Sequence, residues 1–236
     1  MALTGRLSVP RLEAFLRLTL ETALGEVARR FDALGIPFVV LKGPAFARWL
    51  YDDPRERPYG DLDLLVRRTQ MVDAGRALAA LGFALAPPHN TTDVERSYYH
   101  ELWIRPGELP VEVELHYTLG FVSAHPAVVW RRFTDRTDAI EVAGARVATT
   151  SAPVSAFHVA LHAAFHERSN WTTARGDEQP PLRDLRRALD RVDIEVWREA
   201  AAIAAELGAT GAFADGLRRD PRGAALAERL YAPGDR

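Results

Sequence analysis

Several residue types and segment types are missing from this 236-residue chain. It contains no cysteine, which excludes disulfides, thiolate metal sites and cysteine nucleophiles, so metal ligands must come from carboxylates, histidines or backbone groups. No window approaches about 18 uninterrupted apolar residues, so we expect no membrane-spanning helix and no membrane partner. The N-terminal stretch is interrupted by Arg6, Arg11, Glu13 and Arg17 and lacks the apolar run of a secretory signal. We therefore expect a cytoplasmic protein.

Neither sign of charge dominates the sequence. The formal net charge is −2, and 26% of the residues are charged while 47% are hydrophobic, which is typical of a soluble globular protein. Such a chain has no overall attraction to the phosphate backbone of nucleic acids. We therefore do not expect nucleic acid to be a general partner.

Lysine is nearly absent, since Lys42 is the only lysine among the 30 Lys and Arg residues. It stands in the stretch VVLKGPAF, directly after a short apolar run, 38–41, that is typical of a buried strand. Gly43 follows, and Pro44 then suits the first turn of a helix. A lone ammonium at a turn from strand to helix is a candidate phosphate contact, and the alternative is a surface lysine at the end of a strand.

The hydrophobic pattern changes near residue 150. Before this point, stretches with helical spacing, 12–31 and 71–81, alternate with short strand-like runs. Thr69 is a candidate N-terminal cap of the helix predicted over 71–81. After it, helical segments rich in alanine and leucine continue toward the C-terminus, with no strand candidate of comparable strength. The sequence predicts an α+β domain over 1–150 and a helical domain over 151–236.

Two β-hairpins are predicted in the first of these domains. The strand-like stretches 97–104 and 111–119 flank the turn sequence RPGELP. A second hairpin is expected within 139–150, around Ala143 and Gly144.

The stretch DLDLLV, residues 61–66, places two carboxylates on one face of a strand. In an extended chain Leu62 and Leu64 point to one side, while Asp61 and Asp63 point to the other. A divalent cation can bridge two carboxylates that are arranged in this way.

The stretch VEVELHY, residues 111–117, offers more carboxylates at the same spacing. Its polar face carries Glu112, Glu114 and His116. If the two strands lie side by side with these faces together, the carboxylates converge, and their mutual repulsion is tolerable only when cations are bound. Oxygen ligands of this kind select Mg²⁺ or Mn²⁺. For either strand alone, the alternative is an ordinary solvent-exposed face.

Three motifs together resemble a known family. They are LKG at 41–43, RPYGDLDLLV at 57–66 and VELHY at 113–117. The combination is similar to the nucleotidyltransferase superfamily with the DNA polymerase β-like fold, and in particular to its group of uncharacterised bacterial nucleotidyltransferases. The resemblance implies a mixed sheet flanked by helices, followed by a C-terminal helical bundle domain that completes the cleft.

The resemblance also implies roles for individual residues. Asp61, Asp63 and Glu114 would be catalytic and would ligate Mg²⁺ or Mn²⁺, with Glu112 as the competitor for the third carboxylate. The candidates for nucleotide binding are Lys42, Gly43 and Arg57, of which the two cations are chosen on charge and position alone. Two histidines, His116 on the acidic strand and His162 in the helical half, are further candidates for the site.

The implied activity is a Mg²⁺-dependent transfer of a nucleoside monophosphate from an NTP to an acceptor hydroxyl. The acceptor could be a small molecule, a protein or an RNA end. A departure from the superfamily pattern is Pro44 after Gly43, because proline removes one amide donor from the turn. Two alternatives therefore stay open: a catalytically degenerate protein that binds a nucleotide or a partner, and a toxin-like enzyme that modifies a tRNA or a protein.

His158, His162 and His166 follow one another at helical spacing and would share one helix face. Two of them could in principle bind Zn²⁺. The favoured interpretation is that these histidines line the interface between the two halves of the chain.

Overall fold

The computed structural model describes residues 8–87, 99–165 and 180–232. Its internal contacts divide the chain into two compact units, Met1–Leu119 with Phe133–Thr150, and Gly120–Arg132 with Ser151–Arg236. His166 lies outside the described residues, so its place in the expected row of histidines is an untested prediction.

The segment 120–132 groups with the helical unit, although the sequence analysis placed it with the α+β part. The backbone N–H groups of Ser123 and Ala124 both donate to the carbonyl of Leu207, and Arg132 forms an ion pair with Glu206. These partners all belong to the second unit, and none of them could be identified from local sequence.

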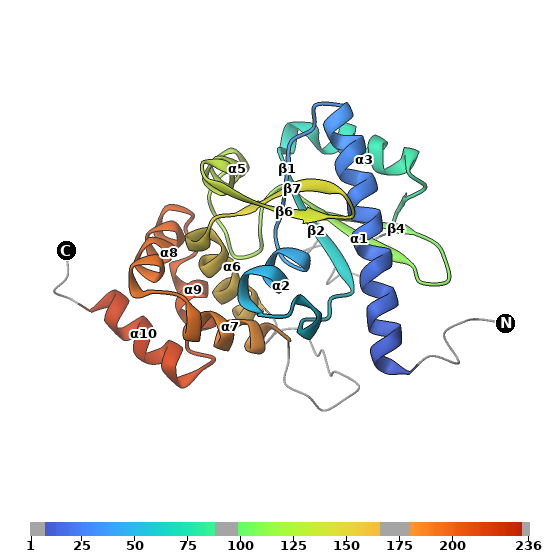
Figure 1. The fold of residues 1–236 in the computed structure, drawn as a ribbon. Helices are drawn as coiled ribbons and strands as arrows, with labels where there is room; N and C mark the ends of the chain where they lie inside the picture. Colours follow the sequence, from blue (N-terminus) through green and yellow to red (C-terminus); the bar gives the residue numbers. More distant parts are fainter. Residues whose placement is uncertain (1–7, 88–98, 166–179, 233–236) are drawn as a thin grey trace. The chain divides into compact units, whose positions relative to one another are not determined.

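A seven-stranded mixed sheet forms the frame of the first unit (Figure 1). Its strands are β1 (Phe38–Val40), β2 (Asp61–Val66), β3 (Ala84–Leu85), β4 (His100–Arg105), β5 (Val111–His116), β6 (Thr137–Val142) and β7 (Ala145–Thr150). The order across the sheet is β3-β4-β5-β2-β1-β7-β6. β2 runs parallel to β5 and β1 parallel to β7, while the other neighbours are antiparallel. The predicted mixed sheet flanked by helices is thus confirmed.

Both predicted hairpins are present. β4 and β5 pair across the RPGELP turn, with Arg105 opposite Val111. β6 and β7 are joined by Ala143 and Gly144, whose φ angles of 46° and 72° match the two positive values of a type I′ turn.

The first unit also contains helices α1 (Val9–Ala33), α2 (Pro44–Leu50) and α3 (Met71–Ala80), and short 3₁₀ turns η2 (Pro54–Glu56) and η3 (Arg68–Gln70). The expected cap of α3 is wrong, because Thr69 lies inside η3. Gln70 holds the capping position, and its side chain makes no cap hydrogen bond. The 3₁₀ turn leads into the helix through backbone bonds instead, since the N–H of Gln70 donates to Arg67.

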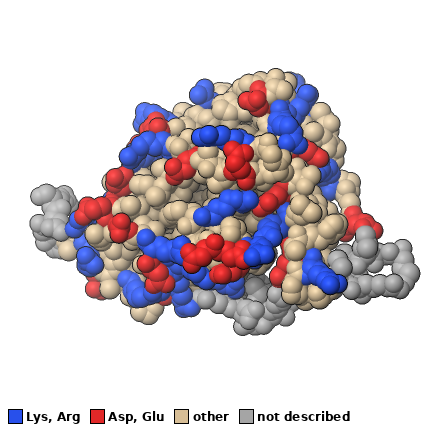
Figure 2. All heavy atoms as spheres, in the orientation of Figure 1, with Lys and Arg blue, Asp and Glu red and all other residues tan. Residues whose placement is uncertain are grey.

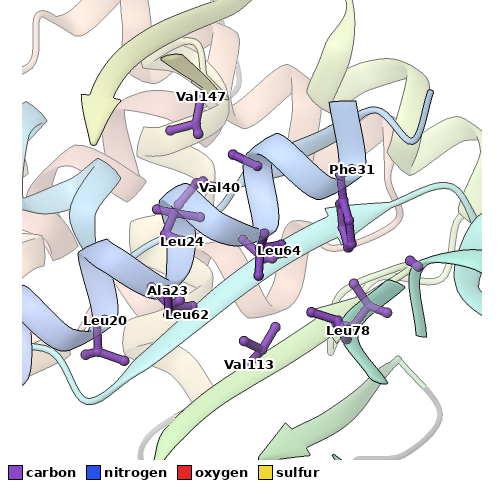
Figure 3. Close-up of a cluster of buried hydrophobic side chains, with 14 of the residues drawn as sticks. Leu20, Ala23, Leu24, Phe31, Val40, Leu62, Leu64, Leu78, Val113 and Val147 are labelled. Carbon is purple, nitrogen blue, oxygen red and sulfur yellow. The ribbon is translucent and has the colours of Figure 1, made fainter. Parts of the chain in front are cut away.

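The hydrophobic core of this unit lies between α1 and the sheet (Figure 3). Helix α1 contributes Leu20, Leu24 and Phe31 at helical spacing, and β2 contributes Leu62 and Leu64. All five side chains have no exposed surface. Since burial of each such side chain is worth about 1.5–3 kcal/mol, this contact fixes which face of β2 points toward α1.

The second unit is helical in the described residues. Its helices are α5 (Pro126–Thr134), most of which belongs to this unit, α6 (Ala152–Phe165), α7 (Pro180–Arg191), α8 (Ile194–Glu206), α9 (Thr210–Leu217) and α10 (Pro221–Tyr231). α6 packs against α7, α8 and α9, and an aromatic group of Phe157, Trp197 and Phe213 joins three of these helices. The described residues after Thr150 contain no strand, as predicted.

Acidic and basic side chains are intermixed on the face of the molecule drawn in Figure 2. This mixture agrees with the small net charge of −2. No helix in the described part of the chain is both long and apolar enough to cross a membrane.

Candidate active site

The pairing of β2 with β5 brings the two acidic strands together. The strands are parallel neighbours, with Asp61 opposite Glu112 and Asp63 opposite Glu114. Leu62, like Leu64, belongs to the core beneath α1, so the alternating aspartates point away from that core. The alternation of the two strands and their register therefore place carboxylates from both strands on one face of the sheet.

Three of these carboxylates form a compact group, called here the carboxylate cluster: Asp61, Asp63 and Glu114. One oxygen from each lies within 4.8 Å of the others. The Asp63 side chain has no exposed surface, and its Oδ2 atom has no hydrogen-bond partner among the described residues. A buried carboxylate oxygen without a partner is costly, and a hard cation would satisfy it. The donor set consists of carboxylate oxygens only, which is the chemistry that Mg²⁺ and Mn²⁺ prefer.

The ammonium of Lys42 lies against the carboxylate cluster. Its Nζ is 2.8 Å from Asp63 Oδ1 and 3.2 Å from Asp61 Oδ2, and the Lys42 side chain is only 16% exposed. Burial alone would lower the pKa of the ammonium, but the negative charges of the three carboxylates outweigh burial and raise that pKa. The antiparallel pairing of β1 and β2 explains this position, since the Leu41 N–H donates to the Asp63 carbonyl and Lys42 follows directly.

His116, the last residue of β5, contacts one carboxylate of each acidic strand. Its Nε2 lies 3.2 Å from Asp63 Oδ1 and 3.3 Å from Glu114 Oε2. Burial alone would lower the pKa of this imidazole, but its hydrogen bonds to the two carboxylates raise the pKa to about 9, so the ring is a cation near neutral pH. Burial alone would likewise raise the pKa of Glu114, but Lys42 and His116 hold it well below its usual range.

The turn after β1 is built on Gly43. This residue has φ 58° and ψ −115°, which only glycine adopts readily, and it precedes the buried Pro44 at the first position of α2. The N–H of Ala45 donates to the Lys42 carbonyl at 3.2 Å. Pro44 has no N–H and that of Ala45 is already used, so the turn offers fewer free backbone donors than an ordinary glycine turn.

Comparison with known proteins decides the family. The family model described as "Uncharacterised nucleotidyltransferase" matches residues 11–219, which include nearly all of both units. The chain belongs to this nucleotidyltransferase family. It is therefore a member of a family of transferase enzymes, as its three motifs predicted.

Solved structures with a similar fold include an antibiotic-resistance factor and a nucleotidyltransferase-like protein. The antibiotic-resistance factor ANT(2″)-Ia in solution has a TM-score of 0.53 and 17% identity, with 82% of this chain and 95% of that chain covered. ANT(2″)-Ia in complex with adenylyl-2″-tobramycin has a TM-score of 0.52 and 17% identity, with 79% of this chain and 98% of that chain covered. An antigenic nucleotidyltransferase-like protein from Paracoccidioides brasiliensis has a TM-score of 0.54 and 17% identity, with 91% of this chain and 98% of that chain covered. At this identity the likeness concerns the fold, and no curated protein matches the sequence.

Glu112 of this nucleotidyltransferase lies at the edge of the acidic face. It lies opposite Asp61 in the pairing of β2 with β5. Among the described residues, however, it belongs to no group of side chains that could hold a metal ion. Burial raises the pKa of its carboxyl, and the charges of Asp61 and Glu114 add to the increase. The geometry therefore favours Glu114 over Glu112 as the third carboxylate.

Arg57, expected to contact phosphate, is buried beside the glycine turn. It is 5% exposed, its Nη1 donates to the Gly43 carbonyl at 3.3 Å, and its guanidinium lies 5.5 Å from the centre of the Phe46 ring. These contacts indicate that Arg57 holds the turn in place.

His100 is a neighbour of the cluster that the sequence analysis missed. It pairs with His116 across the β4–β5 hairpin, and its Nε2 lies 3.9 Å from Glu114 Oε1. Burial lowers the pKa of its imidazole to about 4, so the ring is neutral near pH 7. Counting outward from the RPGELP turn, with Arg105 opposite Val111, would have placed His100 beside this site.

His162 belongs to α6 of the second unit, where its ring centre lies 6.3 Å from that of His158. Residues 8–87, 99–165 and 180–232 contain two groups of side chains that could hold a metal ion, the carboxylate cluster and the group of His100, Glu114 and His116. Neither His158 nor His162 belongs to them. A role for His162 in the active site is still a prediction.

Proposed function

We propose that this nucleotidyltransferase moves a nucleoside monophosphate from an NTP to an acceptor hydroxyl, with Asp61, Asp63 and Glu114 as its catalytic carboxylates. The observation that carries the proposal is the register of β2 and β5, which gathers these three carboxylates within 4.8 Å. The family match supports the reaction class independently of this geometry.

The carboxylate cluster is the proposed site for Mg²⁺ or Mn²⁺. The fit rests on the oxygen-only donor set and on Asp63 Oδ2, which is buried without a partner among the described residues. A divalent cation held there would supply positive charge that favours ionisation of the acceptor hydroxyl and stabilises the departing pyrophosphate.

The chain's own residues would complete the site. Lys42 supplies an ammonium suited to the negative charge of a triphosphate. His116 contacts both Asp63 and Glu114 through one ring nitrogen, Nε2, and so orients the two carboxylates. Gly43, held by Arg57, keeps the backbone next to Lys42 free of a side chain.

The proposed reaction needs no covalent enzyme intermediate. The acceptor oxygen attacks the α-phosphorus, a new oxygen–phosphorus bond forms, and the bond to the β-phosphate oxygen breaks. Pyrophosphate leaves with that oxygen, and the proton of the acceptor hydroxyl passes to water.

The test is transfer of label from an α-labelled NTP in the presence of Mg²⁺, together with release of pyrophosphate. The acceptor panel includes small hydroxyl compounds, an aminoglycoside because a fold neighbour was solved with adenylyl-2″-tobramycin, a protein mixture and tRNA. Asp61→Asn and Asp63→Asn should each abolish transfer, whereas Asp73→Asn, at an exposed aspartate paired with Arg76, should not. Transfer that survives in Asp63→Asn would rule out the proposal.

A second candidate is a protein of the same fold that binds nucleotide without turnover. The turn at Pro44 favours it, because the amide of Ala45 is already bonded to Lys42 and proline provides none. Calorimetric binding of an NTP with Mg²⁺, without pyrophosphate release over the whole acceptor panel, would support this candidate.

The family match extends over both units, so we also propose that the helical unit contributes to acceptor binding, with His162 as a candidate. His162→Ala should then raise the KM for the acceptor without changing nucleotide affinity. Equal acceptor KM values in the variant and the wild type would remove this assignment.

A further inference from the structure

Lys42 pairs with the same carboxylates that are assigned to the metal. Its Nζ makes ion pairs with Asp61 Oδ2 and Asp63 Oδ1, at 3.2 and 2.8 Å. The three carboxylates of the cluster carry more negative charge than this single ammonium neutralises. The ammonium is therefore a partial substitute for a metal ion, supplied by the chain itself.

An ammonium in this position competes with a bound cation. A divalent ion held by Asp61 and Asp63 would lie next to Nζ, and two cations that share the same anions repel each other at short range. Asp63 Oδ2 has no hydrogen-bond partner among the described residues, so the cluster can accept a cation. Such a cation would weaken the ion pairs of Lys42 with Asp61 and Asp63. Removal of the ammonium from the cluster would thus strengthen metal binding.

We propose that Lys42 is a displaceable internal counter-ion that makes metal binding depend on the nucleotide. Without nucleotide, the ammonium occupies the cluster and keeps the affinity for metal low. A triphosphate attracts the ammonium away from the aspartates, so the metal and the nucleotide enter the site cooperatively. This inference rests on the proposed function and adds to it a residue that controls the loading of the site.

The choice of lysine supports this role. The chain uses arginine for every other cationic side chain of the Lys and Arg type, so arginine would be the expected residue here. A guanidinium presents a planar fork that binds carboxylates in a bidentate manner, whereas an ammonium is a compact charge on a flexible stem. A group that must alternate between carboxylates and phosphates is better served by the second chemistry.

The first experiment measures Mn²⁺ affinity without nucleotide, from the electron paramagnetic resonance signal of free Mn²⁺. A cation within hydrogen-bond distance lowers the affinity of a carboxylate for a proton by about tenfold or more. The same repulsion acts on a metal ion that binds to that carboxylate. We therefore expect Lys42→Met to bind Mn²⁺ at least about tenfold more tightly than the wild type. The matched control is Arg48→Met, which removes a cation from neighbouring α2 that is paired with Glu21. Its Mn²⁺ affinity should equal that of the wild type.

Equal or weaker Mn²⁺ binding by Lys42→Met would overturn the proposal, and so would an equal gain in Arg48→Met. A nonhydrolysable NTP analogue should tighten Mn²⁺ binding strongly in the wild type and much less in Lys42→Met. Equal tightening in the two proteins would contradict the proposed coupling.

The second experiment uses the wild-type chain and so does not depend on the folding of a variant. Because Lys42 is the only lysine, protein labelled with ¹³Cε-lysine gives one lysine side-chain resonance. Addition of Mg²⁺ with the nucleotide analogue should move this resonance as the ammonium leaves the aspartates. An unmoved resonance at saturation would overturn the proposal.

Neither experiment requires turnover, so failure of this inference is distinguishable from failure of the proposed function. A wild type that never releases pyrophosphate, yet gives the expected Mn²⁺ result, would overturn the function alone. Normal transfer with equal Mn²⁺ affinities in wild type and Lys42→Met would overturn only the role of Lys42.

Discussion

The glycine turn beside Lys42 provides a sharp test of the local structure. Gly43 has φ 58° and ψ −115°, close to the mirror image of an extended residue and outside the regions allowed to L-residues. Gly43→Ala would force an L-residue into this conformation. Gly60→Ala is the matched control, because Gly60 has no positive φ and its added Cβ would meet nothing within 4 Å.

The expected cost follows from the backbone and not from crowding. A Cβ on Gly43 would lie 3.4 Å from the Asp61 carbonyl oxygen and 3.5 Å from Tyr59 Cδ2, which is ordinary van der Waals contact. A residue held in a sparsely populated region costs about 1–3 kcal/mol. Both substitutions reduce the freedom of the unfolded chain equally, so the difference between the two variants isolates this strain.

The assay is equilibrium unfolding in urea, followed by circular dichroism. Gly43→Ala should lower the free energy of unfolding by about 1–3 kcal/mol relative to Gly60→Ala, through a lower midpoint at an unchanged m-value. If the free energies of unfolding of the two variants agreed within about 0.5 kcal/mol, the reasoning would be refuted, because Gly43 would then not hold a positive φ in solution.

Two further pairs of variants test the structure elsewhere. Glu114→Gln should abolish detectable Mn²⁺ binding, whereas Glu112→Gln should change the Kd for Mn²⁺ less than about threefold, since only Glu114 belongs to the carboxylate cluster. If Glu112→Gln abolished Mn²⁺ binding and Glu114→Gln did not, Glu112 would be the third carboxylate. In α9, Gly216→Ala should destabilise the protein by about 1–3 kcal/mol or more, because its Cβ would collide with the Ala160 carbonyl of α6. Gly211→Ala in the same helix points into open space and should leave stability unchanged or raise it by up to about 1 kcal/mol, so urea midpoints that shift alike would contradict this packing.

Local patterns were sufficient to predict several parts of the fold. The alternation in β2 and β5 identified which side chains share a face, because a strand has a period of two. Ala143 and Gly144 specified their hairpin because a two-residue turn of this type needs two positive φ angles. The motifs around Lys42 and Asp61 predicted the family.

Other features depend on contacts that local sequence does not encode. The parallel pairing of β2 with β5 joins strands separated by two other strands in the chain, so the meeting of Asp63 with Glu114 could only be a hypothesis. The role of Lys42 as a phosphate contact stays a prediction, whereas its ion pairs with Asp61 and Asp63 follow from the register of β1 on β2 and were not anticipated. Arg57 is buried against Phe46, which no spacing rule indicates.

The most direct test of the account is a crystal structure of the protein soaked with Mn²⁺ and a nonhydrolysable NTP analogue. Anomalous scattering from manganese locates the metal without prior assumptions. The account predicts a strong peak coordinated by Asp61, Asp63 and Glu114, with Lys42 turned away from the two aspartates. A peak bound elsewhere, for example at His158 and His162, or an empty carboxylate cluster at saturating Mn²⁺, would contradict it.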